Sequence, residues 1–397
     1  MAPAPHNPKA NLFRQSMIAE IYKEAMQCQA VDLAMGAPDF PAPSAFKEAA
    51  VDAVRRDCNQ YGNGWGIMPL REAIARKVNS QFGISVSPAT EITVTCGATE
   101  GVFLALVAAL EPGDEVILFE PFYESYIAAA SLIGARPRFV RLNPPGWQFS
   151  MDELIAAVTP RTRAVVLNSP NNPTGKVFSK QELQAVAQIC IDHNLICITD
   201  EIYEHIVFDG ARHYSMLQLP EMRERTIVVS AASKSYSVTG WRIGWTIAPP
   251  AFTSVLRKTH ELVTVAAPAP LQEATVVSLA APESYYRELA AVNQKRRDYL
   301  ISVLAPLGFT CLPVQGAFYL MAGIRALTDM DDVQFARFLI QEIGVATVPG
   351  SIFFSDAREH NDLLRFCFSK AESTLTLAAE RLQALPARMR VHAEAAR

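Results

Sequence analysis

The chain has 397 residues, of which 50% are hydrophobic and 19% are charged, and its formal net charge is −4. This length and composition exclude a disordered protein and allow two globular domains, or one large domain with a smaller companion. The slightly negative charge gives no indication of the strongly basic surface of a nucleic-acid-binding protein or of a protein held at an acidic membrane.

Short apolar segments alternate with longer helical patterns from about residue 90 to residue 250. Because these segments are apolar almost throughout, we expect strands that are covered on both faces, and hence a mostly parallel sheet flanked by helices. The predicted strands are residues 91–95, 115–120, 137–142, 163–169, 195–200, 226–232 and 241–248.

Beyond about residue 285, a long polar helical pattern leads to a shorter set of apolar segments, 316–323, 344–350 and 363–369. We expect these segments to form a smaller α/β domain, which the first forty or so residues join. The predicted large domain therefore covers residues 46–285, and the predicted small domain covers residues 1–45 and 286–397.

Small or polar residues follow five of the predicted strands at their carboxyl ends. In chain order they are Gly97, Ala98 and Thr99, then Tyr123, then residues 168–175 with Asn172, then Asp200, and last Lys234. Ligands of open α/β sheets bind outside the carboxyl ends of the strands. Taken alone, Lys234 is most simply a surface lysine just past a strand, but the shared edge favours a functional role.

Residues 97–99 open an apolar helical pattern, where backbone N–H groups and the helix dipole favour an anion. Thr99 by itself is explained equally well as a helix N-cap. Ser233 and Arg242 lie on either side of a turn at Gly240, and they could add a hydroxyl and a bidentate guanidinium to the same anion. A phosphate group fits this set of donors.

Asp200 ends a predicted buried strand, so its carboxylate needs a cationic partner to stay ionised. A lysine that reacts with carbonyl groups needs desolvation or a nearby cation to lower the pKa of its amine. Pyridoxal phosphate meets both needs, because its aldehyde reacts with a lysine, its ring nitrogen pairs with an aspartate, and its phosphate needs a helix N-terminus and an arginine. Tyr203 and Asn172 can bond the phenolic oxygen of the ring, and Tyr123 can stack on its face.

The order of several motifs resembles the class I aminotransferases among the fold-type I pyridoxal-phosphate enzymes. The motifs are AMGAPDFPAP (34–43), QYGNGWGIMPLREAI (60–74), ITVTCGATEGVF (92–103), EPFYESY (120–126), NNPTGKVF (171–178), TDEIY (199–203), SKSYSVTGWRIG (233–244) and LLRFCFS (363–369). The resemblance covers nearly the whole chain and is strongest to the kynurenine and glutamine transaminase branch. It implies an α/β fold in which the large domain carries a mostly parallel seven-stranded sheet.

The resemblance also implies a role for each matching residue. Lys234 would hold pyridoxal phosphate and then move a proton between the substrate α-carbon and the cofactor. Asp200 would bind the ring nitrogen, and Asn172 and Tyr203 the ring oxygen. The phosphate would be held by Gly97, Ala98, Thr99, Ser233 and Arg242, and by Tyr61 of a neighbouring subunit, which implies a homodimer. Arg365 would bind the substrate α-carboxylate with help from Asn172 and Gly36. Arg365 shares a strand face with Leu363 and Cys367, so we expect it to be buried with an anionic partner.

Two departures from the family pattern bear on the site. Ala231 replaces a second phosphate-binding serine, so either one hydroxyl contact is missing or Ser230 compensates. Ile18 and the pair Val265 and Ala266 stand where kynurenine-type enzymes carry aromatic residues.

The expected substrates are a neutral or basic, non-aromatic amino acid as donor and a 2-oxo acid as acceptor. The helical positions of Arg257 and Arg296 supply no clear second carboxylate site. The acidic residues Glu120, Glu124, Glu204 and Asp209 leave a cationic side chain open, although most such acids face solvent.

Three other functions share features with this sequence. A pyridoxal-phosphate-dependent C–S β-lyase uses the same site and stays open. An NAD-dependent dehydrogenase is weakly suggested by GNGWG (62–66), but no predicted strand precedes this motif. A regulator that binds the cofactor without catalysis is a further alternative, but the sequence shows no basic face or helix-turn-helix segment that would support it. The seven scattered cysteines and the lack of an apolar signal segment predict a cytoplasmic protein without a metal site, nucleic-acid partner or membrane anchor.

Overall fold

A seven-stranded sheet forms the larger part of the computed structural model, which describes residues 16–358 and 360–395. Residues 1–15 of the predicted small domain therefore lie outside the described part of the chain. The strand order is β2-β8-β7-β6-β5-β3-β4. The strands are β2 (Ile92–Thr95), β3 (Glu115–Glu120), β4 (Arg136–Arg141), β5 (Thr162–Asn168), β6 (Ile196–Asp200), β7 (Thr226–Ala231) and β8 (Gly244–Ile247).

The pairing of these strands confirms the mostly parallel sheet. The pairs from β4 through β3, β5 and β6 to β7 are parallel, and only the pairs that β8 makes with β7 and β2 are antiparallel. Residues of β3 and β7 are buried along their whole length, as their apolar sequences predict. The carboxyl ends of β5, β6 and β7 consequently meet at one edge.

Two predicted strands differ from the expectation. In the edge strand β4 only Val140 is buried, and Arg136 and Arg138 are exposed, since charged side chains keep the sheet edge from pairing further. The predicted strand at 241–248 begins only at Gly244, since a helical turn covers Thr239–Trp241 and Arg242 has a left-handed backbone with φ of 57°.

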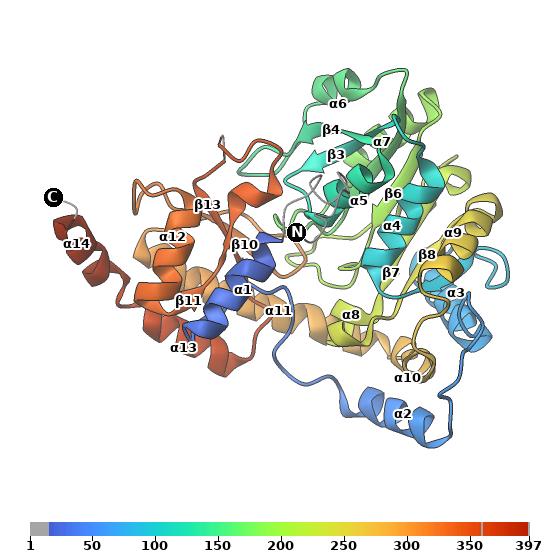
Figure 1. Ribbon diagram of the computed structural model, residues 1–397, viewed down its shortest axis with the longest axis horizontal. Coiled ribbons are helices and arrows are strands. Elements are labelled where there is room, and N and C mark those ends of the chain that lie inside the picture. Colours follow the sequence, from blue (N-terminus) through green and yellow to red (C-terminus); the bar gives the residue numbers. More distant parts are fainter. Residues whose placement is uncertain (1–15, 359, 396–397) are drawn as a thin grey trace, which may run out of the picture.

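Helices surround this sheet and extend into the rest of the chain (Figure 1). For example, α7 starts at a capping box in which the Ser179 hydroxyl and the Glu182 carboxylate each accept a backbone N–H. The helices are α1 (Met17–Gln27), α2 (Ser44–Arg55), α3 (Met68–Phe82), α4 (Ala98–Ala109), α5 (Ser125–Ile133), α6 (Met151–Ala157), α7 (Lys180–Asp192), α8 (Ala232–Ser235), α9 (Pro250–Val263), α10 (Ala269–Leu279), α11 (Glu283–Leu304), α12 (Asp332–Phe338), α13 (Glu372–Leu382) and α14 (Leu385–Ala395). No helix in the described ranges is both long enough and apolar enough to cross a membrane.

A second group of elements joins the two ends of the chain. The strands β12 (Val348–Pro349), β13 (Leu363–Cys367), β10 (Tyr319–Gly323) and β9 (Thr310–Cys311) form an antiparallel sheet in that order, and β1 (Val31–Asp32) pairs in parallel with β11 (Val345–Ala346). Figure 1 shows the blue helix α1 lying among these orange and red elements. The domain limits of 46–285 and of 1–45 with 286–397 stay a proposal, and α11 begins near the boundary.

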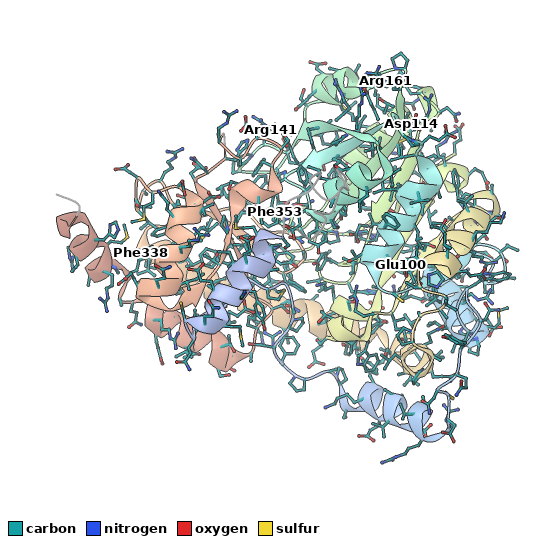
Figure 2. All side chains as sticks on the ribbon, viewed as in Figure 1. Glu100, Asp114, Arg141, Arg161, Phe338 and Phe353 are labelled. Carbon is teal, nitrogen blue, oxygen red and sulfur yellow. The ribbon has the colours of Figure 1, made fainter. Side chains whose placement is uncertain are left out.

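One cluster of buried apolar side chains runs from the large sheet to the smaller one. It includes Ile117 and Val165 of the large sheet and Leu320 and Phe366 of the smaller sheet. Figure 2 labels Phe353 where the two parts meet and Glu100 at the start of α4 on the large-sheet side. The junction between the two parts is therefore tightly packed, and it holds the cavity described next.

Candidate active site

A cavity of about 290 Å³ lies at the carboxyl ends of the large-sheet strands, next to the smaller sheet. It is lined by residues from α1, α4, α5, α8, β5, β6, β10 and β13 and from the loops beside them. All the predicted site residues except Gly97 and Tyr61 line it: Gly36, Ala98, Thr99, Tyr123, Asn172, Asp200, Tyr203, Ser233, Lys234, Arg242 and Arg365.

Lys234 is not a simple surface lysine. It lies in the short helix α8 directly after β7, and its Nζ atom donates a hydrogen bond of 2.6 Å to the carbonyl oxygen of Gly36. Burial lowers the pKa of Lys234 to about 8, and the nearby charges of Arg365 and Arg242 act in the same direction. About a tenth of this amine is therefore neutral, and hence nucleophilic, at pH 7, far more than for an ordinary lysine.

Asp200 ends β6 inside the same cavity, and its carboxylate is almost completely buried. The Tyr126 hydroxyl donates to its Oδ2 atom at 2.7 Å, and the N–H of Ile202 donates to Oδ1 at 3.3 Å. Burial raises the pKa of Asp200 to about 6, although both hydrogen bonds oppose this rise. A cation placed in the cavity would bring the pKa down again. Tyr126 was not among the predicted residues.

The turn at residues 97–99 is built to approach an anion. Gly97 has a φ of 82° and precedes α4 without any side-chain cap, so Thr99 is not the N-cap that one interpretation allowed. A Cβ atom at Gly97 would lie 2.3 Å from Nη2 of Arg242, so the close approach of this guanidinium requires glycine. The Glu100 carboxylate accepts the N–H of Cys96 and a hydrogen bond from Thr264 at 2.9 Å, which braces the turn.

Two further donors face this turn. The Ser233 hydroxyl is buried and has no hydrogen-bond partner in the described part of the chain. The Arg242 guanidinium donates to the carbonyl oxygens of Thr239 at 3.0 Å and Cys96 at 3.3 Å. Because both acceptors are neutral, they do not compensate the positive charge of the guanidinium. A buried hydroxyl, a guanidinium and the N-terminus of a twelve-residue helix therefore converge on one place.

Ser230 does not compensate for Ala231. Its hydroxyl donates to the buried Glu204 carboxylate at 3.2 Å, and neither Ser230 nor Ala231 lines the cavity. The Glu204 carboxylate also pairs with Lys77. The suggested compensation is therefore wrong, because Ser230 already belongs to a charged cluster outside the cavity.

Arg365 is buried, as predicted, but its expected anionic partner is absent from the described residues. Nη1 donates to the Asn172 side chain at 2.9 Å and Nη2 to the carbonyl oxygen of Ala34 at 2.7 Å, while Nε is buried without a partner. The guanidinium carbon lies 4.4 Å from the centre of the Tyr319 ring and 5.0 Å from that of Phe353. A buried cation held by neutral oxygens with a free N–H suits an incoming carboxylate.

Tyr203 and Asn172, which both line the cavity, each belong to a short set of hydrogen bonds. The hydroxyl groups of Tyr203 and Tyr319 lie 2.9 Å apart, and the N–H of Asn172 donates to the Asn168 side chain at 2.7 Å. Asn168 in turn donates to the carbonyl oxygen of Asp200 at 2.9 Å. Tyr319, like Tyr126, was missed by the sequence analysis, although the residue lies in the predicted segment 316–323.

The structure separates some predicted residues from the cavity of their own chain. Tyr61 is 85% exposed, and Val265 is 50% exposed. Ile18 lines the cavity, whereas Val265 and Ala266 do not. Residues 62–66 lie in a loop between α2 and α3, so the glycine-rich motif follows no strand and the dinucleotide interpretation is wrong.

The four acidic residues considered for a cationic substrate are engaged elsewhere. Glu120 accepts the N–H of Ser355 at 2.9 Å, Glu124 accepts the Ser16 hydroxyl, Glu204 pairs with Lys77 and Asp209 with Arg297, and none of these acids lines the cavity. The two arginines also lie outside it, with Arg257 over the Trp65 ring at 4.3 Å and Arg296 over the Phe40 ring at 4.1 Å.

Comparisons with known proteins agree on one family. The family model described as aminotransferase class I and II matches residues 29–382. Methionine aminotransferase of Escherichia coli K12 is 39% identical over 361 residues, which cover 91% of this chain and 93% of the relative. Human kynurenine–oxoglutarate transaminase 1 is 36% identical over an alignment that covers 92% of this chain and 94% of the relative. The solved structure of N-succinyldiaminopimelate aminotransferase from Mycobacterium tuberculosis matches with a TM-score of 0.93 at 40% identity, over 96% of this chain and 99% of that chain.

Proposed function

Because the chain belongs to the class I and II aminotransferases, we propose that it moves the amino group of an L-amino acid to a 2-oxo acid by a ping-pong mechanism with pyridoxal phosphate as cofactor. The observation that carries this proposal is the placement of Lys234 and Asp200 in one cavity. The cofactor's aldehyde needs a lysine amine with a lowered pKa, and its protonated ring nitrogen needs a buried carboxylate that, among the described residues, has no ion-pair partner of its own.

The residues present fit this cofactor. Asp200 would pair with the protonated ring nitrogen, Tyr203 and Asn172 would bond the ring oxygen, and Tyr123 would cover one ring face. The unpartnered Ser233 hydroxyl, Arg242 and the N–H groups of residues 97–99 would hold the phosphate. When bound, pyridoxal phosphate supplies an electron sink for the negative charge that develops at the substrate α-carbon.

Lys234 carries two tasks in this proposal. Its neutral amine would bind the cofactor aldehyde covalently, and after release it would move a proton between the substrate α-carbon and the cofactor. Its lowered pKa serves both tasks, because the amine must be unprotonated before each one. The carbonyl oxygen of Gly36 holds the amine in the cavity that Arg365 also lines.

Arg365 would bind the α-carboxylate of every substrate, with Asn172 and the backbone of Gly36 beside it. Its Nε atom has no partner among the described residues, and its Nη atoms bond neutral oxygens that a carboxylate can outcompete. Binding the carboxylate at Arg365 orients the α-carbon toward Lys234, which is the geometry that proton transfer requires.

For the amino donor, we propose a neutral and non-aromatic side chain. Ile18, Met35 and Val102 give the cavity an apolar wall, and its lining cations within the described ranges are Lys234, Arg242 and Arg365. A basic donor loses its support, because the acids considered for it are engaged outside the cavity. A relative named methionine aminotransferase is in keeping with an unbranched neutral donor.

The test is a screen of amino acids against 2-oxoglutarate and pyruvate with the purified protein. We expect methionine or glutamine to exceed kynurenine and phenylalanine. A tenfold preference for either aromatic donor, which is about 1.4 kcal/mol of transition-state stabilisation, would contradict the substrate assignment. Release of ammonia and pyruvate without any added 2-oxo acid would instead identify a C–S β-lyase.

We further propose a homodimer in the cytoplasm. Tyr61 and Leu262 are each 85% exposed, and Trp65 bonds Glu261 at 2.6 Å, which brings the loop of Tyr61 next to the end of α9. Exposed apolar side chains gathered in this way are typical of a protein interface. An interface there would let Tyr61 reach the phosphate site of the neighbouring subunit, and sedimentation analysis of the purified protein tests it. The free state of all seven cysteines is in keeping with a reducing compartment.

A further inference from the structure

Tyr319 begins β10 and is buried at the point where the smaller sheet meets the cavity. It contacts three residues to which the proposed site assigns different roles. Its hydroxyl meets Tyr203, its ring meets Arg365, and its edge meets the backbone of Gly36.

The ring of Tyr319 supports the Arg365 guanidinium. The guanidinium carbon lies 4.4 Å from the centre of this ring and 5.0 Å from that of Phe353. Cation–π contacts of a buried arginine are stabilising, and they restrict the plane of the guanidinium. In the described part of the chain, this cation is therefore held by two neutral oxygens, those of Asn172 and Ala34, and by the two aromatic rings, while its Nε atom has no partner.

The hydroxyl of Tyr319 supports Tyr203. The two hydroxyl oxygens are 2.9 Å apart and both side chains are buried. Burial raises the pKa of both Tyr203 and Tyr319, so both hydroxyls keep their protons near neutral pH. Tyr203 can therefore accept a hydrogen bond from Tyr319 and donate its own proton to the cofactor ring oxygen, and the first bond strengthens the second.

The side chain of Tyr319 also packs against the loop that carries Gly36. A Cβ atom at Gly36 would lie only 2.0 Å from the Tyr319 hydroxyl oxygen, so the two are in direct contact. The carbonyl oxygen of Gly36 accepts the hydrogen bond of Lys234. Tyr319 thus lies against the segment that orients the amine, as well as against Arg365 and Tyr203.

We infer that Tyr319 is a positioning residue of this site, with its ring setting the carboxylate-binding arginine and its hydroxyl setting the hydrogen bond from Tyr203 to the cofactor. The inference rests on the proposed function. It separates two roles within one side chain, because Tyr319→Phe removes the hydroxyl and keeps the ring, whereas Tyr319→Leu removes both.

Two measurements that need no turnover test the inference on the cofactor-loaded protein. The first is the pH midpoint of the cofactor's visible absorbance, which reports the hydrogen bond to its ring oxygen. The second is the Kd of 4-methylpentanoate, a carboxylate without an amino group that cannot react, measured by calorimetry. Tyr286→Phe is the matched control, because the Tyr286 and Tyr236 hydroxyls form a similar buried pair at 2.7 Å outside the cavity.

For Tyr319→Phe, we expect the absorbance midpoint to rise by about one pH unit, a tenfold change in proton affinity, while the carboxylate Kd stays within about twofold. The midpoint rises because the hydrogen bond stabilises the negative charge on the ring oxygen, so its loss favours the protonated form of the cofactor. For Tyr319→Leu, we expect the same rise and a Kd about tenfold weaker. Tyr286→Phe should change neither value.

The inference would be overturned if Tyr319→Phe matched Tyr286→Phe in its absorbance midpoint, or if Tyr319→Leu bound the carboxylate like the wild type. If Tyr319→Leu failed to fold by circular dichroism, Tyr319→Met, whose unbranched and flexible side chain adapts better to the space, tests the ring in its place. A wild-type protein that binds the cofactor but transfers no amino group would contradict the proposed function, while both measurements would still decide the role of Tyr319.

Discussion

The hydroxyl of Tyr126 donates a hydrogen bond of 2.7 Å to the carboxylate of Asp200, and both side chains are buried. Tyr126 lies in α5 and Asp200 ends β6, so the contact joins a helix to the sheet edge that holds the cavity. This bond favours the ionised carboxylate, whereas burial favours the neutral one and raises the pKa of Asp200 to about 6. Asp200 is therefore ionised near neutral pH but sensitive to the loss of any one partner.

Tyr126→Phe should weaken the pairing of Asp200 with a cationic ring nitrogen. Loss of a hydrogen bond to a charged group is worth about 1.5–3 kcal/mol, so we expect kcat to fall about tenfold or more. The bond stabilises the ionised carboxylate, so its loss raises the pKa of Asp200 and moves the acid limb of the kcat profile to higher pH. Rate profiles between about pH 5 and 9 measure this shift.

The control is Tyr299→Phe, because Tyr299 is 39% exposed and lies in α11. It should leave the profile unchanged. An unshifted acid limb in Tyr126→Phe would show that the bond to Asp200 has no part in the reaction.

Asp200→Asn should nearly abolish transamination and yet stabilise the cofactor-free protein at alkaline pH. The pKa of Asp200 in the folded protein is about 6 against an ordinary 3.8, so the folded state binds the proton more tightly than the unfolded state. Its favourable contribution to folding is present below pH 3.8 and is lost as the pH rises through about 6. Above that range the buried charge costs about 3 kcal/mol, which the neutral amide avoids.

Urea unfolding of the cofactor-free wild type and variant at about pH 8 and pH 4.5 checks this sign. The stability gain should be present at the higher pH and shrink at the lower one. A variant that is less stable than the wild type at the higher pH would contradict the assignment of a strained, functional carboxylate.

Ser233→Ala should weaken binding of pyridoxal phosphate, and Ser230→Ala should not. The buried Ser233 hydroxyl has no partner in the described part of the chain, so a phosphate is its expected acceptor. A hydrogen bond to a charged oxygen is worth about 1.5–3 kcal/mol, which predicts a Kd at least tenfold weaker. The Ser230 hydroxyl bonds Glu204 at 3.2 Å, so its removal should lower only the free energy of unfolding. Fluorescence titration of the cofactor-free variants measures both affinities, and equal losses would place the phosphate elsewhere.

Mixing two inactive variants tests the contribution of Tyr61 to the partner's site. In a homodimer, a Tyr61→Ala chain keeps Lys234 and a Lys234→Ala chain keeps Tyr61, so each hybrid dimer has one complete site. Random reassortment of equal amounts should restore about a quarter of the wild-type sites. The activity of the mixture after subunit exchange is the measurement. No gain over the separate variants, in a mixture that sedimentation shows to be dimeric, would place Tyr61 outside the neighbouring site.

The part of the site that follows strand ends could be predicted from the sequence. Asp200, Asn172 and Lys234 each follow an apolar segment, and parallel strands bring such positions to one edge of the sheet. The strand segments themselves were clear because buried parallel strands are apolar on both faces. The arginine-rich strand β4 was predicted as a strand, but no comparably simple pattern in its sequence predicted that it lies at the exposed edge of the sheet.

The supporting residues could not be predicted, because their contacts join distant parts of the chain. Tyr126 and Asp200 are 74 positions apart, and Tyr203 and Tyr319 are 116 apart. No local spacing marks such pairs. The role of Ser230 had a usable signal, since successive strand residues point to opposite faces of a sheet and Ser230 therefore could not replace Ala231.

The most direct test of the central claim is to reduce the purified protein with borohydride in the presence of pyridoxal phosphate and to map the modified peptide. The account predicts a pyridoxyl group on Lys234. Lys176 and Lys370 are also buried, but they pair with Glu182 at 2.6 Å and Asp32 at 3.0 Å, and they should remain unmodified. Modification of a different lysine, or undiminished transamination by Lys234→Ala, would contradict the assignment.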